Sequence, residues 1–269
     1  MRGPWGVPRW LRIRTRRMMA TGNFTPGAAV FGNPSGPWGG DYSMVEIRLQ
    51  FDGYDGLGGR AEGRDAAGGQ IFALDLAQIA AAVPCFTATS LIATGQGGVP
   101  VSELVPGARV ITRDNGMQEL LWVGRRRFGW QALGLNPLLR PVRIAAGALG
   151  QGLPERDMLV SPNHRFLTCL PGGGESGERL TMARDLVGLD GITLHAAAEV
   201  DYWQLLFAHH ELVLADGAWS ESFLPTEASL AALESDSRDA VTRALPGLAA
   251  PDHPGAVAVR PLAEVGSAA

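Results

Sequence analysis

The sequence predicts an all-β protein built from many short, twisted strands. Two observations favour this fold class. The 269 residues include 36 glycines and 18 prolines, so turns are frequent and long helices are few. The apolar stretches are short and are bounded by Gly, Pro, Asn or Asp, as strands usually are. Hydrophobic residues make up 46% of the chain and charged residues 19%, which allows a packed core and argues against general disorder.

The first 84 residues divide into two stretches. Residues 1–40 are rich in Arg, Gly and Pro, and we expect them to be poorly ordered. Within residues 41–84, Tyr42–Phe51 alternates apolar and polar side chains as a strand does, and a second apolar run covers Ile71–Leu76. The sequence therefore predicts a small β appendage there, which forms the N-terminal flank of the next domain.

Residues 85–224 have β character throughout. The dipeptide Asn115-Gly116 is a strong hairpin signal, because type I′ turns need two residues that tolerate positive φ. Further strands are expected at Leu91–Thr94, Val99–Leu104, Arg109–Arg113, Pro141–Ala145, Met158–Leu170 and Tyr202–Ala215.

The last stretch, residues 225–269, has a different pattern. Leu230, Leu233, Val241 and Leu245 are spaced so that they can share one helical face, which predicts a short helical segment over Glu227–Leu245. The following residues, 247–269, are rich in Pro and Ala and are expected to be loose.

Composition and charge argue against several classes of function. The net charge of −4 gives no electrostatic case for nucleic-acid binding, and the 23 basic residues are all Arg. No apolar run approaches the roughly 20 residues of a membrane-spanning helix. The Arg-rich start lacks the apolar stretch of a classical signal peptide, so a cytoplasmic location is the default expectation.

The chain contains two cysteines, Cys85 and Cys169, and no Cys-x-x-Cys pair. Neither a disulfide framework nor a structural zinc site is therefore indicated, and no metal or cofactor is expected. Cys169 lies five residues beyond His164 on an expected strand, so it faces the opposite side and is predicted to lie in the core.

Cys85 stands at a sharp change in composition, between the Ala-rich AAAVP and a turn-rich region. A lone cysteine is most often simply buried. However, the stretch CFTATSLIATGQGGVPVSELVPGARVITRDNG resembles the opening block of Hint domains, the self-cleaving β fold shared by inteins and Hedgehog proteins. In that block a Leu-x-x-Gly-x-x-Val segment leads to an acidic hairpin, which here comprises Leu104, Gly107, Val110 and Asp114.

Two later segments extend the resemblance over roughly residues 85–224. Ser161-Pro162-Asn163-His164 is similar to the Thr-x-x-His signature of the family, with Ser in place of Thr. The segment from His210 to Ala215-Asp216-Gly217 resembles the late strand that carries His and then Ala-Asn-Gly. His209 and His210 are neighbours, so they point to opposite faces, and we expect His210 to face the site.

The resemblance implies an autoprocessing reaction. Cys85 would attack the carbonyl of Pro84, moving the acyl group from nitrogen to sulfur and leaving a thioester. His164, as an imidazole that titrates near neutral pH, would protonate the departing nitrogen, and the Ser161 hydroxyl would hold the reacting amide. The substrate would be the chain's own flank, residues 1–84, and water or a thiol would resolve the thioester. Such a protein is a single-turnover cysteine autoprotease rather than a turnover enzyme.

The sequence also departs from the family pattern. The late carboxylate of Hedgehog proteins has no clean match, because Trp203 or Gln204 occupies that region. Where inteins end in His-Asn, this chain reads Trp219–Phe223 (WSESF), so complete splicing is not available and cleavage alone is expected. Pro84 restricts its own backbone and is a less willing electrophile, which predicts slow cleavage.

Two other interpretations stay open. The domain could be a Hint fold that has lost its chemistry and serves as an interaction or secretion-associated module. Alternatively, Cys85 and His164 could form the dyad of an intermolecular peptidase, which would require an open substrate groove.

Overall fold

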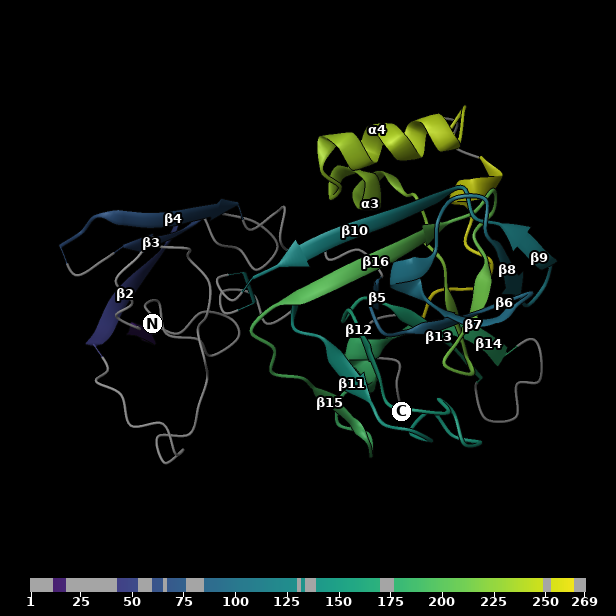
Figure 1. Cartoon of the computed structure of the whole chain (residues 1–269), viewed down its shortest axis with the longest axis horizontal. Coiled ribbons are helices and arrows are strands. Elements are labelled where there is room, and N and C mark those ends of the chain that lie inside the picture. Colours follow the sequence, from purple (N-terminus) through teal and green to yellow (C-terminus); the bar gives the residue numbers. More distant parts are fainter. Residues whose placement is uncertain are drawn as a thin grey trace.

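The computed structural model describes residues 12–17, 43–52, 60–64, 67–75, 85–129, 132–133, 139–169, 177–248 and 253–263. Short strands dominate these residues, and every strand pair in the three sheets is antiparallel (Figure 1). The expected all-β fold class is confirmed, with two short helices near the C-terminus.

The N-terminal sheet has four strands in the order β1-β2-β3-β4. Its strands are β1 (Arg12–Arg17), β2 (Ser43–Asp52), β3 (Arg60–Arg64) and β4 (Gln70–Asp75). Strands β2 and β4 match the two expected strands. Strand β1 lies inside the stretch expected to be poorly ordered. Its sequence RIRTRR pairs along its whole length with β2, so the Arg-rich composition of this segment does not prevent strand pairing.

The second sheet has six strands in the order β10-β16-β5-β12-β11-β15. They are β10 (Trp122–Phe128), β16 (Val200–Leu206), β5 (Phe86–Thr87), β12 (Met158–Val160), β11 (Val142–Ile144) and β15 (Ile192–Leu194). The two-residue strand β5 lies in the middle, where Phe86 pairs with both Val160 and Trp203. Cys85, directly before β5, therefore enters the centre of this sheet.

The third sheet has eight strands, seven of them in the order β14-β13-β18-β17-β6-β8-β9, with β7 paired to β6. They are β6 (Leu91–Thr94), β7 (Gly97–Pro100), β8 (Arg109–Thr112), β9 (Gly116–Glu119), β13 (Arg165–Cys169), β14 (Glu178–Met182), β17 (Leu212–Ala215) and β18 (Ala218–Glu221). Two 3-10 turns complete this region, η1 (Val101–Glu103) and η4 (Ala183–Leu186).

Two hairpins fix the register of the third sheet. The expected hairpin at Asn115-Gly116 is confirmed, with Thr112 paired to Gly116, but only Gly116 has a positive φ, of 66°, so the turn is a three-residue loop and not a type I′ turn. In the β17–β18 hairpin, Asp216 and Gly217 have φ values of 49° and 83°, as a two-residue type I′ turn requires. This turn places Glu221 directly opposite Leu212.

The expected helical segment of the tail is also confirmed. It consists of α3 (Glu227–Ala231) and α4 (Ser235–Ala244), which lie over β10 and β16 (Figure 1). Helix α3 begins after Thr226, whose hydroxyl accepts a hydrogen bond of 3.1 Å from the Ser229 backbone N–H, as an N-cap residue does.

The chain then crosses back over the domain as a strap, which we define as residues 253–263 and which contains the 3-10 turn η5 (Pro254–Ala256). Leu180 of β14 donates to the Pro261 carbonyl and accepts from the Ala263 amide, both at 2.9 Å. Arg260 bonds Glu178 and Asp114, each at 2.8 Å. The strap therefore differs from the expected loose end, because its backbone pairs with a strand and its arginine joins two carboxylates.

Buried hydrophobic residues form two clusters on the domain. One includes Phe86, Val160 and Phe166, and the other includes Cys85, Tyr202 and the tail residues Leu233, Val241 and Leu245. Cys85 and Phe86 thus contribute to different clusters, as successive residues of an extended chain do.

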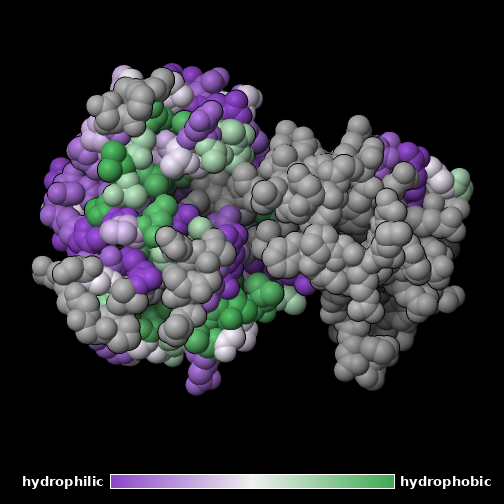
Figure 2. All heavy atoms as spheres, turned by 180° about the vertical axis from the view of Figure 1, so that it is seen from behind, coloured by the Kyte–Doolittle hydropathy of each residue, from purple (hydrophilic) through white to green (hydrophobic). Residues whose placement is uncertain are grey.

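The outer surface carries hydrophilic residues with smaller hydrophobic areas between them on the face that Figure 2 shows. Large exposed hydrophobic side chains come from several separate elements, among them Val105, Met117 and Leu194. Among the residues that the structure describes, no helix is long and apolar enough to cross a membrane.

Candidate functional site

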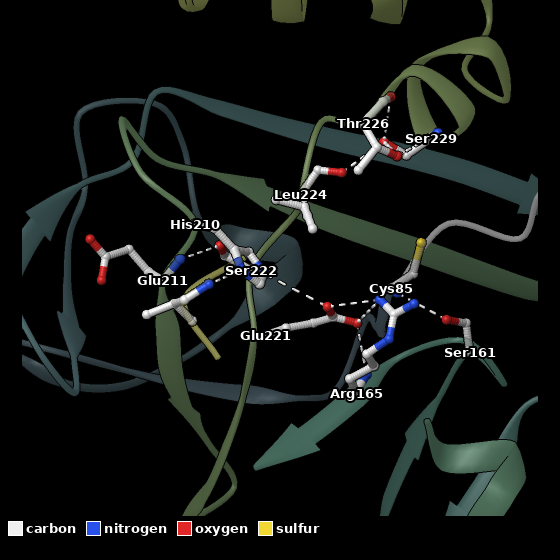
Figure 3. A network of polar contacts seen from close by, with 11 residues as sticks. Cys85, Ser161, Arg165, His210, Glu211, Glu221, Ser222, Leu224, Thr226 and Ser229 are labelled. Carbon is white, nitrogen blue, oxygen red and sulfur yellow. Dashed lines mark hydrogen bonds and ion pairs between the residues drawn. The ribbon is translucent and has the colours of Figure 1, made fainter. Parts of the chain in front are cut away.

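The backbone of Cys85 is held at both of its polar groups by Ser161. The Cys85 N–H donates a hydrogen bond of 2.9 Å to Ser161 Oγ, and the Ser161 N–H donates one of 3.0 Å to the Cys85 carbonyl (Figure 3). Ser161 is fully buried, and Cys85 is 4% exposed. The structure thus brings together two expected site residues that are 76 positions apart.

Local structure explains how Ser161 reaches Cys85. Strand β12 ends at Val160, which pairs with Phe86, so the next residue lies beside the residue before Phe86. The chain then turns, and the His164 N–H donates to the Ser161 carbonyl at 3.0 Å. The segment Ser161–His164 is therefore a compact turn between β12 and β13.

His164 is fully buried against aromatic rings. Its ring centroid lies 4.4 Å from that of Phe86 and 5.2 Å from that of Phe166, both edge-on. Within the described part of the chain, neither ring nitrogen has a hydrogen-bond partner. The structure thus places His164 against Phe86, which belongs to the other buried cluster from Cys85, and no contact between the His164 ring and the Cys85 thiol is among the described contacts. A buried imidazole with no partner is costly, because a neutral ring always carries one N–H donor.

The surroundings of His164 also change its acidity. Burial lowers the pKa of His164 to about 4, the nearby Glu221 carboxylate opposes this shift, and Arg165 adds to it. The expectation that His164 titrates near neutral pH is therefore wrong. The ring is neutral at pH 7, because the apolar rings around it disfavour the charged form.

The Cys85 thiol lines a small cavity of about 20 Å³ together with Arg126, Tyr202 and Gln204. Burial raises the pKa of the thiol, a hydrogen bond from Gln204 and the charge of Arg126 partly oppose this, and Glu221 adds to the rise. The thiol is therefore protonated at neutral pH. It needs a proton acceptor before it can act as a nucleophile.

The helical tail covers this cavity. Leu233, Glu234 and Ser237 contribute to its lining, and the Arg126 guanidinium donates to the Ala232 carbonyl at 2.9 Å. Cys169, by contrast, is exposed at the end of β13, so the prediction that it lies in the core was wrong. A strand end at the surface lets that side chain reach solvent.

Gln204 lies in the region that corresponds to the late carboxylate of Hedgehog proteins, and it contacts the Cys85 thiol. It pairs across the sheet with Gly124. A Cβ added at Gly124 would lie 2.7 Å from Gln204 Oε1 and would also overlap the Trp122 ring. The absence of a side chain at Gly124 therefore makes room for the amide that faces the thiol.

Burial distinguishes the neighbouring residues His209 and His210. His209 is exposed and His210 is buried, so of the two it is His210 whose side chain lies inside the domain, and its orientation towards the Cys85 site stays a prediction. Its Nδ1 accepts a hydrogen bond of 3.1 Å from the Val259 N–H of the strap. Its Nε2 lies 3.7 Å from Glu221 Oε2.

Sequence reasoning missed Glu221. Its side chain is fully buried, and Arg165 binds it through the backbone N–H at 2.9 Å and through Nη1 at 3.1 and 3.2 Å (Figure 3). The available signal was the Asp216-Gly217 turn, which fixes the register of β18 and with it the strand position of Glu221.

Within the described segments, no group of three or more His, Cys, Asp or Glu side chains could hold a metal ion.

Comparisons with known proteins place this arrangement in context. A family model described as the Hint domain matches residues 84–227. Among solved structures, the gp41-1 intein is 15% identical with a TM-score of 0.33, covering 51% of this chain and 97% of its own. A bacterial intein-like domain from Clostridium thermocellum is 14% identical with a TM-score of 0.35, covering 51% and 97%. A DnaB intein from Synechocystis is 13% identical with a TM-score of 0.33, covering 52% and 98%. No curated protein matches.

Proposed function

Since this chain belongs to the Hint domain family, we propose that its Hint domain cleaves the chain at the Pro84–Cys85 bond. The observation that carries the proposal is the double hydrogen bond between Cys85 and Ser161. It fixes the nitrogen of the bond to be broken. Pro84 itself lies outside the described residues.

The proposed first step is an acyl shift from nitrogen to sulfur. Cys85 Sγ attacks the Pro84 carbonyl carbon, a new S–C bond forms, and the C–N bond between Pro84 and Cys85 breaks. The proton that leaves the thiol ends on the Cys85 nitrogen, which becomes a free amine. Ser161 Oγ already accepts from this nitrogen, so it can hold the amine as it forms.

Proton transfer falls to His164 in this proposal. A neutral imidazole has one lone pair and one N–H, so it can accept a proton at one nitrogen and give one from the other. Neither nitrogen has a hydrogen-bond partner within the described part of the chain, so neither is committed to another group. His164 therefore relays the thiol proton to the departing nitrogen.

The second step is attack on the thioester by water or a thiol, which releases residues 1–84 and restores the Cys85 thiol. Splicing is not part of the proposal, because the segment directly after β18 has Ser222 and Phe223 where an intein would end in Asn and continue with its nucleophile. The domain would act once, on its own chain.

A second candidate function, a Hint fold without chemistry, is favoured by one observation. The Cys85 thiol is covered by the tail helices, and its pKa is raised by burial. A domain in this state would serve as a binding or secretion-associated module.

Incubation of the purified full chain with a thiol distinguishes the two functions. Autoprocessing predicts fragments 1–84 and 85–269, the latter with 185 residues, and Cys85→Ala should abolish them completely. Cys169→Ala is the matched control, because it removes the other cysteine and should leave cleavage unchanged. If wild type and Pro84→Gly both remain intact, the fold has lost its chemistry.

A mixing experiment separates autoprocessing from an intermolecular peptidase. Wild type is incubated with a tagged Cys85→Ala chain, which retains the same flank but cannot form the thioester. Autoprocessing in cis predicts that the tagged chain stays intact while wild type is cleaved. Cleavage of the tagged chain would instead support the peptidase.

A further inference from the structure

A charged cluster lies inside the domain beyond the residues that the family pattern identifies. It consists of Glu221 on β18, Arg165 on β13 and His210 before β17, and we refer to it as the late cluster (Figure 3). The Glu221 side chain is fully buried and that of Arg165 is 14% exposed. Removing such charges from water is costly, and a hydrophobic pair would often be equally stable or more so. The cluster therefore calls for an explanation beyond stability.

The hydrogen bonds of the late cluster show which of its atoms donate and which accept. Arg165 satisfies both oxygens of Glu221, through the bonds given above. His210 Nδ1 accepts from the Val259 amide, so in its neutral form the ring must carry its proton on Nε2. That nitrogen faces Glu221 Oε2 at 3.7 Å. The strap thus sets the tautomer of His210, and the carboxylate faces its N–H.

Arg165 of the late cluster is also the direct neighbour in the chain of His164, one of the proposed site residues. The amide that donates to Glu221 Oε1 at 2.9 Å is the one that joins these two residues, so the carboxylate lies beside the His164 backbone. Glu221 lies opposite Arg165 and offsets its positive charge. Consistently, Arg165 lowers the pKa of His164 and Glu221 raises it, while Glu221 also acts on the Cys85 thiol.

The other charged groups near these histidines already have partners. Arg184 belongs to the 3-10 turn whose Ala183 N–H donates to the His164 carbonyl at 2.8 Å; it donates to Asn163 at 2.8 Å and lies 3.8 Å from Asp185. Glu211 accepts from Asn115 at 2.9 and 3.1 Å. On the strap side, Glu178 is shared by Arg113 and Arg260. Among the described contacts, Glu221 is the carboxylate that touches both Arg165 and His210.

We propose that Glu221 is a positioning residue for autoprocessing: it anchors Arg165 and cancels its charge beside His164, which keeps that imidazole able to accept the Cys85 proton. This inference rests on the proposed function. The sequence has no clean match to the late carboxylate of Hedgehog proteins. In this proposal Glu221 provides a carboxylate from β18 and acts through its contact with Arg165.

The test compares two buried carboxylates that stand close together in the fold. Glu221→Gln keeps the shape of the side chain and removes the charge that offsets Arg165. We expect it to slow thiol-induced cleavage about tenfold, since a charge at this range shifts a pKa by roughly one unit or more. Glu211→Gln is the matched control and should keep the wild-type rate. Equal rates for wild type and both variants would overturn the proposal.

A double variant guards against simple loss of folding. Arg165→Met with Glu221→Met removes both charges together, and such a replacement is usually tolerated. If Glu221 acts by cancelling the charge of Arg165, His164 in the double variant should keep a pKa close to that of wild type. A His164 pKa as low as in Glu221→Gln would contradict charge cancellation.

A histidine-selective NMR titration gives a readout that needs no cleavage. The pKa of His164 should fall by about one unit in Glu221→Gln and stay unchanged in Glu211→Gln. If wild type does not cleave but these shifts are observed, autoprocessing fails while the electrostatic role of Glu221 stands. If wild type cleaves and Glu221→Gln leaves the His164 pKa unchanged, the role of Glu221 is refuted and autoprocessing is retained.

Discussion

The Cys85–Ser161–His164 group and the late cluster differ in how completely their polar atoms are satisfied. In the first group, the Cys85 backbone is bound on both sides, but the His164 ring lies among aromatic rings with no polar partner in the described part of the chain. In the late cluster, Arg165 satisfies the carboxylate and the strap binds His210 Nδ1, while His210 Nε2, which has no hydrogen-bond partner among the described residues, faces Glu221 Oε2 at 3.7 Å. Unsatisfied groups are available for a reaction, whereas satisfied groups hold charges in place. We therefore assign chemistry to the first group and positioning to the second.

Replacing each histidine by alanine tests this assignment most strongly. His164→Ala should slow cleavage by about 10²- to 10⁴-fold, the usual contribution of a positioned proton-transfer group. His210→Ala should slow it only about tenfold, because that ring acts through Glu221. Gel densitometry of the 185-residue fragment over time measures both rates. Equal cleavage rates in the two variants would contradict the assignment of chemistry to His164 and of positioning to His210.

The two cysteines provide a second contrast. Cys169 is exposed and Cys85 is buried with a raised pKa, and the thiolate is the reactive form. We expect an alkylating reagent to modify Cys169 at least about a hundredfold faster, since each unit of raised pKa lowers the thiolate fraction about tenfold. Peptide mapping by mass spectrometry measures the ratio. Leu233→Asp in the tail should increase labelling of Cys85, and equal labelling of both cysteines in wild type would show that the helices do not cover the thiol.

Acid should destabilise the domain through His164. The pKa of this residue is about 4 in the folded state and 6.5 when unperturbed, so the unfolded chain takes up the proton first as the pH falls. Stability should therefore be unaffected by His164 above pH 6.5 and should decline between pH 6.5 and 4, by about 3 kcal/mol in full. Urea denaturation at pH 7 and pH 4.5 measures the change. In His164→Leu this part of the pH dependence should disappear, and an identical pH dependence in both proteins would contradict the assignment.

The smallest expected effect concerns Ser161. Ser161→Ala removes one orienting hydrogen bond, worth about 1 kcal/mol, and should slow cleavage about five- to tenfold. Ser222→Ala is a suitable control, because Ser222 Oγ likewise accepts a buried backbone N–H, that of Glu211 at 2.9 Å. The assignment would be undermined if Ser222→Ala slowed the reaction as much as Ser161→Ala.

Much of the fold could be predicted from local patterns in the sequence. The strands at Leu91–Thr94 and Arg109–Thr112, the Asn115-Gly116 hairpin and the tail helices all follow from alternation, turn chemistry and helical spacing. The proximity of Cys85 and Ser161 was implied by the family resemblance. It depends on a short strand of two residues, which no local pattern could have placed.

The late cluster and the strap could not be predicted in the same way. Glu221 is an ordinary charged residue in the sequence, and its burial depends on contacts with Arg165, which is 56 positions away. The strap looked loose because Pro- and Ala-rich composition gives no pairing signal, although its backbone bonds to Leu180 hold it. The acidity of His164 likewise depends on rings that only the fold brings together.

The most direct test of the account is the mass of the released N-terminal fragment. The full chain is incubated with a small thiol of known mass, and residues 1–84 are analysed intact. A thioester at Cys85 predicts a fragment that carries the thiol at its C-terminus, because the thiol replaces Cys85 Sγ on the Pro84 carbonyl. A fragment with a free carboxylate and no trace of the adduct at any thiol concentration, or an uncleaved chain, would contradict thioester formation at Cys85.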